Sequence, residues 1–161
     1  MKKFAELQYV RPDMEKVFAR VSEDIAALKE AKSYEEFKNA YMDFVEADTE
    51  LETAKTVAHI RNTINLLDSF YEGEMAYFNS QMPKYGILKK EMGEVIVASP
   101  FKGEMEKEFG SILLQNMEAQ KQPSDECIVD DQVEEAELVK QYMKTQAAAT
   151  VAFRGEELWA Y

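Results

Sequence analysis

The chain contains a single histidine, His59, and this one residue excludes several kinds of catalytic site. A zinc peptidase helix of the His-Glu-x-x-His type needs two histidines one turn apart. A di-iron bundle needs Glu-x-x-His motifs, and here Thr56 stands three residues before His59. A serine or cysteine nucleophile would have only His59 as its base, and the residues around Cys127 do not resemble a nucleophile elbow. We therefore predict no catalytic, metal-binding or cofactor-binding residue in this chain, and interpret His59 as an ordinary helix residue, exposed or hydrogen-bonded.

A second group of polar residues lies along the most apolar stretch of the chain. Glu74 occupies a position where helical spacing calls for an apolar side chain. Arg61 and Asp68 are seven residues apart, about two helical turns, on one side of the same stretch. These residues either form a polar cluster that orients a ligand or a neighbouring domain, or they have structural roles. We favour structural roles, in which Glu74 reaches the helix edge or pairs with a cation and Asp68 caps a helix.

The remaining polar features do not indicate a reaction. The acidic pairs Asp130-Asp131 and Glu134-Glu135 are typical of a solvated helix face, because no loop of oxygen ligands surrounds them. The sequence has no glycine-rich phosphate loop. The tyrosines and methionines fall at helical spacing, which favours core packing over a cofactor site.

The stretch from Val57 to Val95 is expected to organise the fold. As one helix it would be about 58 Å long at about 1.5 Å per residue, so it should bend or form two helices. Asp68-Ser69 followed by Glu72 predicts a capping box at a first break, and Pro83 with Gly86 marks a second weak point. We expect the other helices to pack on its apolar face. The residues of that face, three or four positions apart outside two gaps, are Val57, Ile60, Ile64, Leu67, Tyr71, Phe78, Met82, Tyr85, Met92 and Val95.

Capping and stop signals divide the rest of the chain into further helices, joined by breaks short enough for antiparallel neighbours. Residues 1–12 are expected to form an extended lead-in to an N-cap at Asp13. Before the central stretch we expect a helix from Met14 to about Ala31, a helix from Tyr34 to about Ala47 behind a Ser33–Glu36 capping box, and a helix that runs from an Asp48-Thr49 cap into the central stretch, which ends at Ser99-Pro100. After it we expect a helix from Gly103 to Phe109, a helix from Ser111 to about Gln120 and a short turn around Ile128 after Pro123. The last expected elements are a helix from Glu134 to Thr145, with Leu138, Val139 and Tyr142 as its apolar side, and a β-hairpin around Gly155-Glu156-Glu157.

We therefore predict a mainly α fold with one domain over residues 1–161. It is an antiparallel multi-helix bundle with long helices over about 13–145 and a C-terminal β-hairpin over 148–161, whose second strand would stop with the chain. The net charge of −12 argues against nucleic acid and anionic membranes as partners. No apolar run approaches about 20 residues. The N-terminus lacks the apolar core of a secretory signal, and a single cysteine permits no internal disulfide. These features predict a cytoplasmic location.

Short motifs are distributed over the whole length of the sequence. They are Phe4-Ala5-Glu6-Leu7, Tyr9 and Arg11-Pro12-Asp13 at the start, Ile60-Arg61, Ile64, Asp68, Phe70-Tyr71 and Glu74 in the middle, then Ser99-Pro100-Phe101 and Leu113 after Phe109-Gly110, and finally Val151-Ala152-Phe153 with Gly155-Glu156-Glu157. No motif is diagnostic alone. In their order and spacing they resemble the amino-terminal part of the oligoendopeptidase F group of zinc metallopeptidases, relatives of thimet oligopeptidase and of the Pz-peptidases.

This resemblance implies an architecture and a parent activity. Enzymes of the family are several hundred residues long, mostly helical, and cleave short peptides in a deep channel between two halves. Their zinc, its histidine and glutamate ligands and the general-base glutamate belong to a later catalytic domain that is missing from this sequence. The resemblance therefore implies zinc in the parent enzyme and no cofactor in this chain. Arg61, Asp68 and Glu74 match positions of the family pattern, and we assign them only a scaffold role.

Two hypotheses follow. In the first, the chain is the non-catalytic N-terminal domain of an oligoendopeptidase F-like zinc metalloendopeptidase, inactive alone. It would shape the channel for short peptides, with the C-terminal catalytic domain as its partner. In the second, it is an autonomous helical interaction module or truncated gene product that self-associates as a homo-oligomer, with its terminal hairpins pairing edge to edge. The two hypotheses differ in whether a C-terminal partner exists in the cell.

Overall fold

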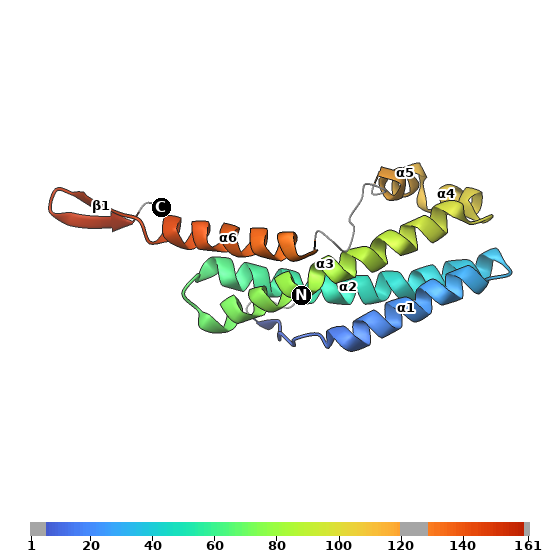
Figure 1. Cartoon of the computed structure of the whole chain (residues 1–161), viewed down its shortest axis with the longest axis horizontal. Coiled ribbons are helices and arrows are strands. Elements are labelled where there is room, and N and C mark those ends of the chain that lie inside the picture. Colours follow the sequence, from blue (N-terminus) through green and yellow to red (C-terminus); the bar gives the residue numbers. More distant parts are fainter. Residues whose placement is uncertain (1–5, 120–128, 160–161) are drawn as a thin grey trace.

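The computed structural model describes residues 6–119 and 129–159, and six helices make up most of an elongated bundle in these two ranges (Figure 1). The prediction of a mainly helical bundle with long helices is confirmed. The helices are α1 (Met14–Glu30), α2 (Tyr34–Ile64), α3 (Ser69–Ala98), α4 (Lys102–Phe109), α5 (Ser111–Ala119) and α6 (Val129–Ala147).

The first three helices begin at residues whose side chains cap them. A carboxylate oxygen of Asp13 accepts a hydrogen bond from the Lys16 amide, and Ser33 Oγ accepts one from the Glu36 amide. Asp68 Oδ1 accepts from the two amides at the start of α3, those of residues 70 and 71. The predicted starts of α1 and α2 and the predicted break before α3 are therefore confirmed. Of the capping box predicted from Asp68-Ser69 and Glu72, Asp68 is the cap, whereas the Glu72 side chain pairs with lysines of α6.

The predicted helix break at Asp48-Thr49 is wrong, because α2 continues through it to Ile64. Asp48 instead accepts hydrogen bonds from the Tyr85 hydroxyl (2.9 Å) and from Lys89, both on α3. Thr49 Oγ1 donates to the carbonyl of Val45 within the helix. Two residues that favour helix ends thus find partners in mid-helix, so packing against α3 overrides their capping preference.

Pro83 does not break α3 either. Proline removes one backbone hydrogen bond, but Phe78 and Tyr85 on either side of it are completely buried. Packing of both turns against α1 and α2 keeps the helix continuous. The predicted second weak point therefore lies inside one 30-residue helix.

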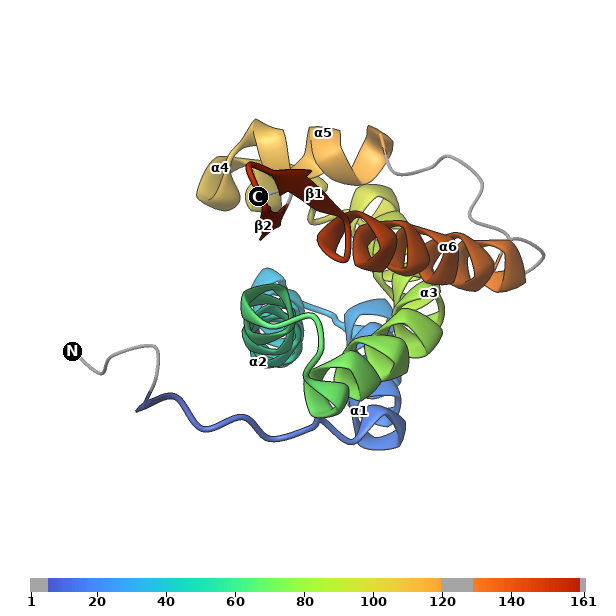
Figure 2. The same cartoon turned by 90° about the vertical axis from the view of Figure 1, so that its left-hand side faces the viewer.

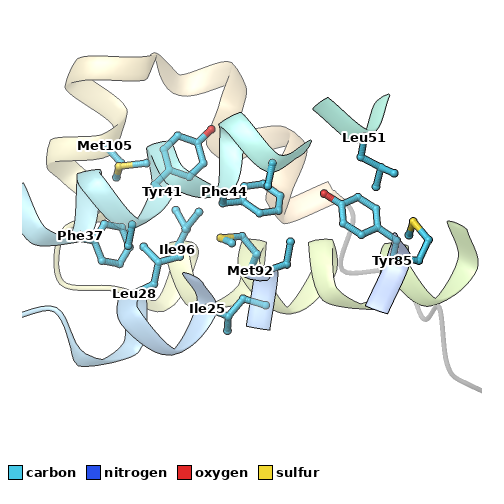
Figure 3. Packing of buried hydrophobic residues seen from close by; sticks show 14 of the residues in the cluster. Ile25, Leu28, Phe37, Tyr41, Phe44, Leu51, Tyr85, Met92, Ile96 and Met105 are labelled. Atoms are coloured by element: carbon cyan, nitrogen blue, oxygen red, sulfur yellow. The ribbon is translucent and has the colours of Figure 1, made fainter. Parts of the chain in front are cut away.

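The hydrophobic core lies between α1, α2 and α3 and extends to α4 and α5 at one end of the bundle (Figure 3). Phe37 of α2 and Ile96 of α3 are almost fully buried there, with Met105 of α4. Gly93 of α3 lies opposite the Met117 side chain of α5, and Gly110 has a φ of 88° at the turn between α4 and α5, a backbone conformation that glycine adopts readily.

The predicted apolar face of the central stretch is only partly buried. Val57, Phe78, Tyr85 and Met92 lie in the core, as expected. In contrast, Ile64 and Leu67 are 74% and 86% exposed at the turn between α2 and α3, and Ile60 and Phe70 nearby are also exposed. The expectation that other helices pack along the whole face is therefore wrong. The chain turns at Asn65–Asp68, so the two halves of the face fall on different helices.

The last helix, α6, lies along the first half of α3 and apart from the core (Figures 1 and 2). It is longer than the predicted Glu134–Thr145 segment. After it, β1 (Thr150–Phe153) and β2 (Glu156–Trp159) pair antiparallel through a turn in which Arg154 and Gly155 have φ of 55° and 85°. The pair projects past the α2–α3 turn (Figure 1). Residues 160–161 of the predicted hairpin and the predicted turn around Ile128 lie outside the described residues.

None of the helices in residues 6–119 and 129–159 is both long and apolar enough to cross a membrane.

Asp24 of α1 leads to a prediction about pH. One of its carboxylate oxygens is buried without a hydrogen-bond partner among the described residues, and this burial raises the pKa of the carboxyl group. The ionised form therefore lowers stability at neutral pH, and the penalty is relieved as the pH falls toward the unfolded-state value of about 3.9. Asp24→Asn should raise the free energy of unfolding at pH 7 by about 0.5 kcal/mol, discounted for the part of the carboxylate that solvent reaches.

Urea unfolding at pH 7 and pH 4.5 measures this effect, with the exposed neighbour Glu23→Gln as a control. The gain from Asp24→Asn should shrink at the lower pH. A loss of stability at pH 7 would contradict the assignment of a strained carboxylate.

Candidate functional site

The residues that precede α1 cross the bundle as an extended segment held by side chains of α2 and α3. Arg61 of α2 donates a hydrogen bond to the carbonyl of Leu7, and the Tyr77 hydroxyl donates to the carbonyl of Pro12 at 2.9 Å. The Tyr9 ring packs edge-on against Tyr71, with ring centroids 5.8 Å apart. The predicted lead-in is therefore extended as expected over residues 7–13, and it is bound at both ends.

Glu74 is the centre of this arrangement and is only 2% exposed. Its carboxylate accepts hydrogen bonds from Arg11, whose Nε lies 3.0 and 3.1 Å from the two oxygens and whose Nη2 also donates, and from the Tyr9 hydroxyl. The Arg11 guanidinium also lies over the Tyr77 ring, 4.6 Å from its centroid. Glu74 thus pairs with a cation, as one of the two structural roles predicted, and does not reach the helix edge.

The protonation equilibria follow from this contact. Hydrogen bonding to Arg11 holds the pKa of the Glu74 carboxyl below its usual value, and the same bond raises the pKa of Arg11. Burial, reinforced by the hydrogen bond to Glu74, raises the pKa of the Tyr9 phenol. Glu74 is therefore an ionised acceptor and cannot serve as a proton donor at neutral pH. This cluster binds its own chain and offers no reactive group.

The other two residues of the predicted group lie beside this segment. Arg61 donates to the Tyr71 hydroxyl as well as to the backbone carbonyl at Leu7, and Asp68 caps α3. The structure therefore places Arg61, Asp68 and Glu74 around one short length of α3. It gives each of them a structural partner within the chain.

His59 is exposed and lines a groove of about 350 Å³ between the α2–α3 hairpin and α6. Met75 of α3 and Val139 and Met143 of α6 contribute its apolar lining, and Asn62 and Asn79 add neutral polar groups. At one side Glu72 of α3 forms ion pairs with Lys140 (3.2 Å) and Lys144 (2.7 Å) of α6. These ion pairs hold the pKa of the Glu72 carboxyl below its usual value.

Sequence reasoning missed this groove and both sets of partners. The two lysines of the Glu72 contact are four residues apart, which places them on one helical face, but nothing in that spacing identifies the acid that they meet. In the sequence, only their place in the family-like motifs distinguished Arg11 and Tyr9 from ordinary surface residues. Cys127 lies outside the described residues.

No group of three or more His, Cys, Asp or Glu side chains that could hold a metal ion occurs among the residues that the structure describes.

The Glu74 contact predicts a stability loss. Glu74→Gln should lower the free energy of unfolding at pH 7 by about 2–3 kcal/mol, because Arg11 and Tyr9 would lose a buried charged acceptor. Since pairing lowers the folded-state pKa, the stabilisation is complete above the unfolded-state value of about 4.3 and is lost as the pH falls through the folded-state pKa. The mutant should show a flatter acid limb.

Chemical denaturation from pH 3 to pH 8 measures this, and Glu46→Gln is a matched control. Glu46 pairs with Arg20 at 2.8 Å on the surface, so its loss should cost at most about 0.5 kcal/mol. Amide hydrogen exchange in residues 7–11 should accelerate only in Glu74→Gln. Equal losses in the two variants would contradict the central role of Glu74.

Comparison with known proteins identifies the family of this chain. The family model described as "Peptidase M3 N-terminal domain" matches residues 4–123. A comparison with curated proteins finds no match.

Solved structures match nearly the whole chain. A structure described as Pz peptidase A with an inhibitor matches at 30% identity and a TM-score of 0.93, covering 98% of this chain and 28% of that one. A structure described as an oligoendopeptidase F matches at 31% identity and a TM-score of 0.94, covering 99% and 28%. A structure described as an oligoendopeptidase F from Bacillus anthracis str. Ames matches at 25% identity and a TM-score of 0.92, covering 98% of this chain and 29% of that one.

The chain thus spans under a third of the length of these solved relatives. The family match covers three quarters of the chain, and the fold agrees over essentially all of it. The resemblance seen in the sequence is confirmed, and the chain belongs to the family of peptidase M3 N-terminal domains.

Proposed function

We propose that this chain is the non-catalytic N-terminal domain of an oligoendopeptidase F-like zinc metalloendopeptidase, inactive alone, which shapes the channel for short peptides. The observation that carries the proposal is the match to oligoendopeptidase F and Pz peptidase structures over 98–99% of this chain but only 28–29% of theirs. With one histidine, the chain cannot supply a His-Glu-x-x-His zinc motif. The zinc and the peptide chemistry would belong to the catalytic domain.

The internal contacts suit a wall of a channel. Glu74, Arg11 and Tyr9 fix the extended segment to α3, and the core ties α1 to α2 and α3. A channel wall has to keep its shape while peptides enter and leave. The proposal includes a cytoplasmic location. It also includes no nucleic-acid partner, which the net charge of −12 supports.

The proposal makes a prediction about peptidase activity. The purified chain with added zinc should not hydrolyse a quenched fluorescent peptide above the rate of a buffer blank, because it has no zinc ligands of the required type. The control is the His59→Ala variant, which should give the same background. Zinc-dependent hydrolysis that copurifies with the chain and is lost in His59→Ala would contradict the proposal.

A second candidate function rests on the exposed apolar residues at the α2–α3 turn. Ile64, Leu67 and Phe70 are 74%, 86% and 55% exposed, and such a group is typical of an interaction surface. The alternative is a helical interaction module that self-associates.

Sedimentation of the chain at increasing concentration tests this alternative. Under the N-terminal domain proposal the chain should remain monomeric at micromolar concentration in low salt, because two copies would each carry a net charge of −12. A stable dimer that Leu67→Asp dissociates would favour the alternative.

A further inference from the structure

One side of α6 carries apolar residues that are largely exposed, and its edge borders the groove beside the α2–α3 hairpin. Leu138, Val139, Tyr142 and Met143 are 58%, 46%, 66% and 48% exposed. They lie at helical positions i, i+1, i+4 and i+5, which together form one continuous stripe. We call these four residues the outer α6 face. The prediction that Leu138, Val139 and Tyr142 form the apolar side of this helix was right about the pattern, but the bundle does not bury them.

A different set of residues attaches α6 to the bundle. Its half-buried residues facing α3 include Ala136, Lys140 and Lys144, and the two lysines are held by Glu72. Because α3 occupies this side, the outer α6 face stays about half exposed over nearly two turns. Val139 and Met143 connect the outer α6 face to the groove that His59 lines. Met143 also lines a neighbouring hollow together with Ile64 and Leu67.

The charges around this face select its partner. Asp130, Asp131, Glu134 and Glu135 are exposed at the start of α6 and form no ion pair with a described residue. A second copy of the chain would bring the same acidic residues and a net charge of −12 to the contact. A segment with apolar side chains at its centre and Lys or Arg at its end would complement both parts of the surface.

We propose that the outer α6 face and its groove bind an apolar, basic-flanked segment from the part of the peptidase polypeptide that this chain does not contain. In the solved relatives more than two thirds of the chain lies outside the matching region. That remaining polypeptide is long enough to contain such a segment. This inference rests on the proposed function, because it names the surface through which the N-terminal domain would join the rest of the enzyme.

The experiment uses as its probe the part of the Pz peptidase A chain outside the matching 28%, produced as a separate polypeptide. Calorimetric titration into the purified 161-residue chain should give a one-to-one complex whose affinity falls as salt rises. Val139→Asp should weaken binding at least tenfold. Ile112→Asp, on α5 and 71% exposed, is the matched control and should change affinity less than twofold.

Since the two polypeptides come from different proteins, the same variants are also made in one joined chain, in which residues 1–161 replace the matching segment of Pz peptidase A. There Val139→Asp should lower the melting temperature and separate one unfolding transition into two, whereas Ile112→Asp should do neither. Far-ultraviolet circular dichroism of the free variants shows whether each keeps its helices.

Several outcomes would overturn the inference. The first is that both substitutions weaken binding equally. The second is that no complex forms and that Val139→Asp and Ile112→Asp have the same effect on the melting of the joined chain. The third is that the 161-residue chain forms a dimer that Val139→Asp dissociates. A complex that forms but does not respond to Val139→Asp would overturn the docking face and leave the proposed function standing. Peptide hydrolysis by the 161-residue chain alone would instead overturn the proposed function.

Discussion

An ionised carboxylate that is 2% exposed is costly to desolvate, and Glu74 is kept in that state by Arg11 and Tyr9, more than 60 residues earlier in the chain. The contact joins the extended N-terminal segment to the middle of the bundle. Arg61 and Tyr77 hold the same segment through backbone carbonyls, so its course depends on polar contacts more than on buried apolar area. Removing the acceptor would leave Arg11 and Tyr9 without the partner that fixes the segment on α3.

The bundle is less uniform than its helix content suggests. Three long helices share one apolar core, to which α4 and α5 contribute Met105 and Leu114. The attachment of α6 is different in kind, because it depends on two lysines around Glu72 and on small or half-buried residues facing α3. Its largest apolar side chains, Leu138 and Tyr142, are 58% and 66% exposed. The fold therefore combines one shared apolar core with one helix whose largest apolar side chains are mostly exposed.

The chain belongs to the family of peptidase M3 N-terminal domains, and its sequence shows no obvious reaction centre. The polar residues that attract attention, Arg61, Asp68 and Glu74, are all engaged within the chain. His59 lines a groove beside apolar side chains, the amides of Asn62 and Asn79, and the Glu72 carboxylate with its two lysine partners.

The sequence by itself determined the helical class, the starts of α1, α2 and α3 and the family, because capping side chains act on amides within three residues and family motifs are local. It also predicted breaks at Asp48 and Pro83 that do not exist. Local preference favours a break at both, and contacts with α3 for Asp48 and with the core on both sides of Pro83 outweigh it. Only the tertiary structure decided that Glu74 meets Arg11, that Glu72 meets Lys140 and Lys144, and that Leu67 and Tyr142 face solvent. The physical reason is that these contacts depend on which helices, distant in the sequence, pack against each other. Helical periodicity identifies the apolar face of one segment but does not identify the segment that packs on that face.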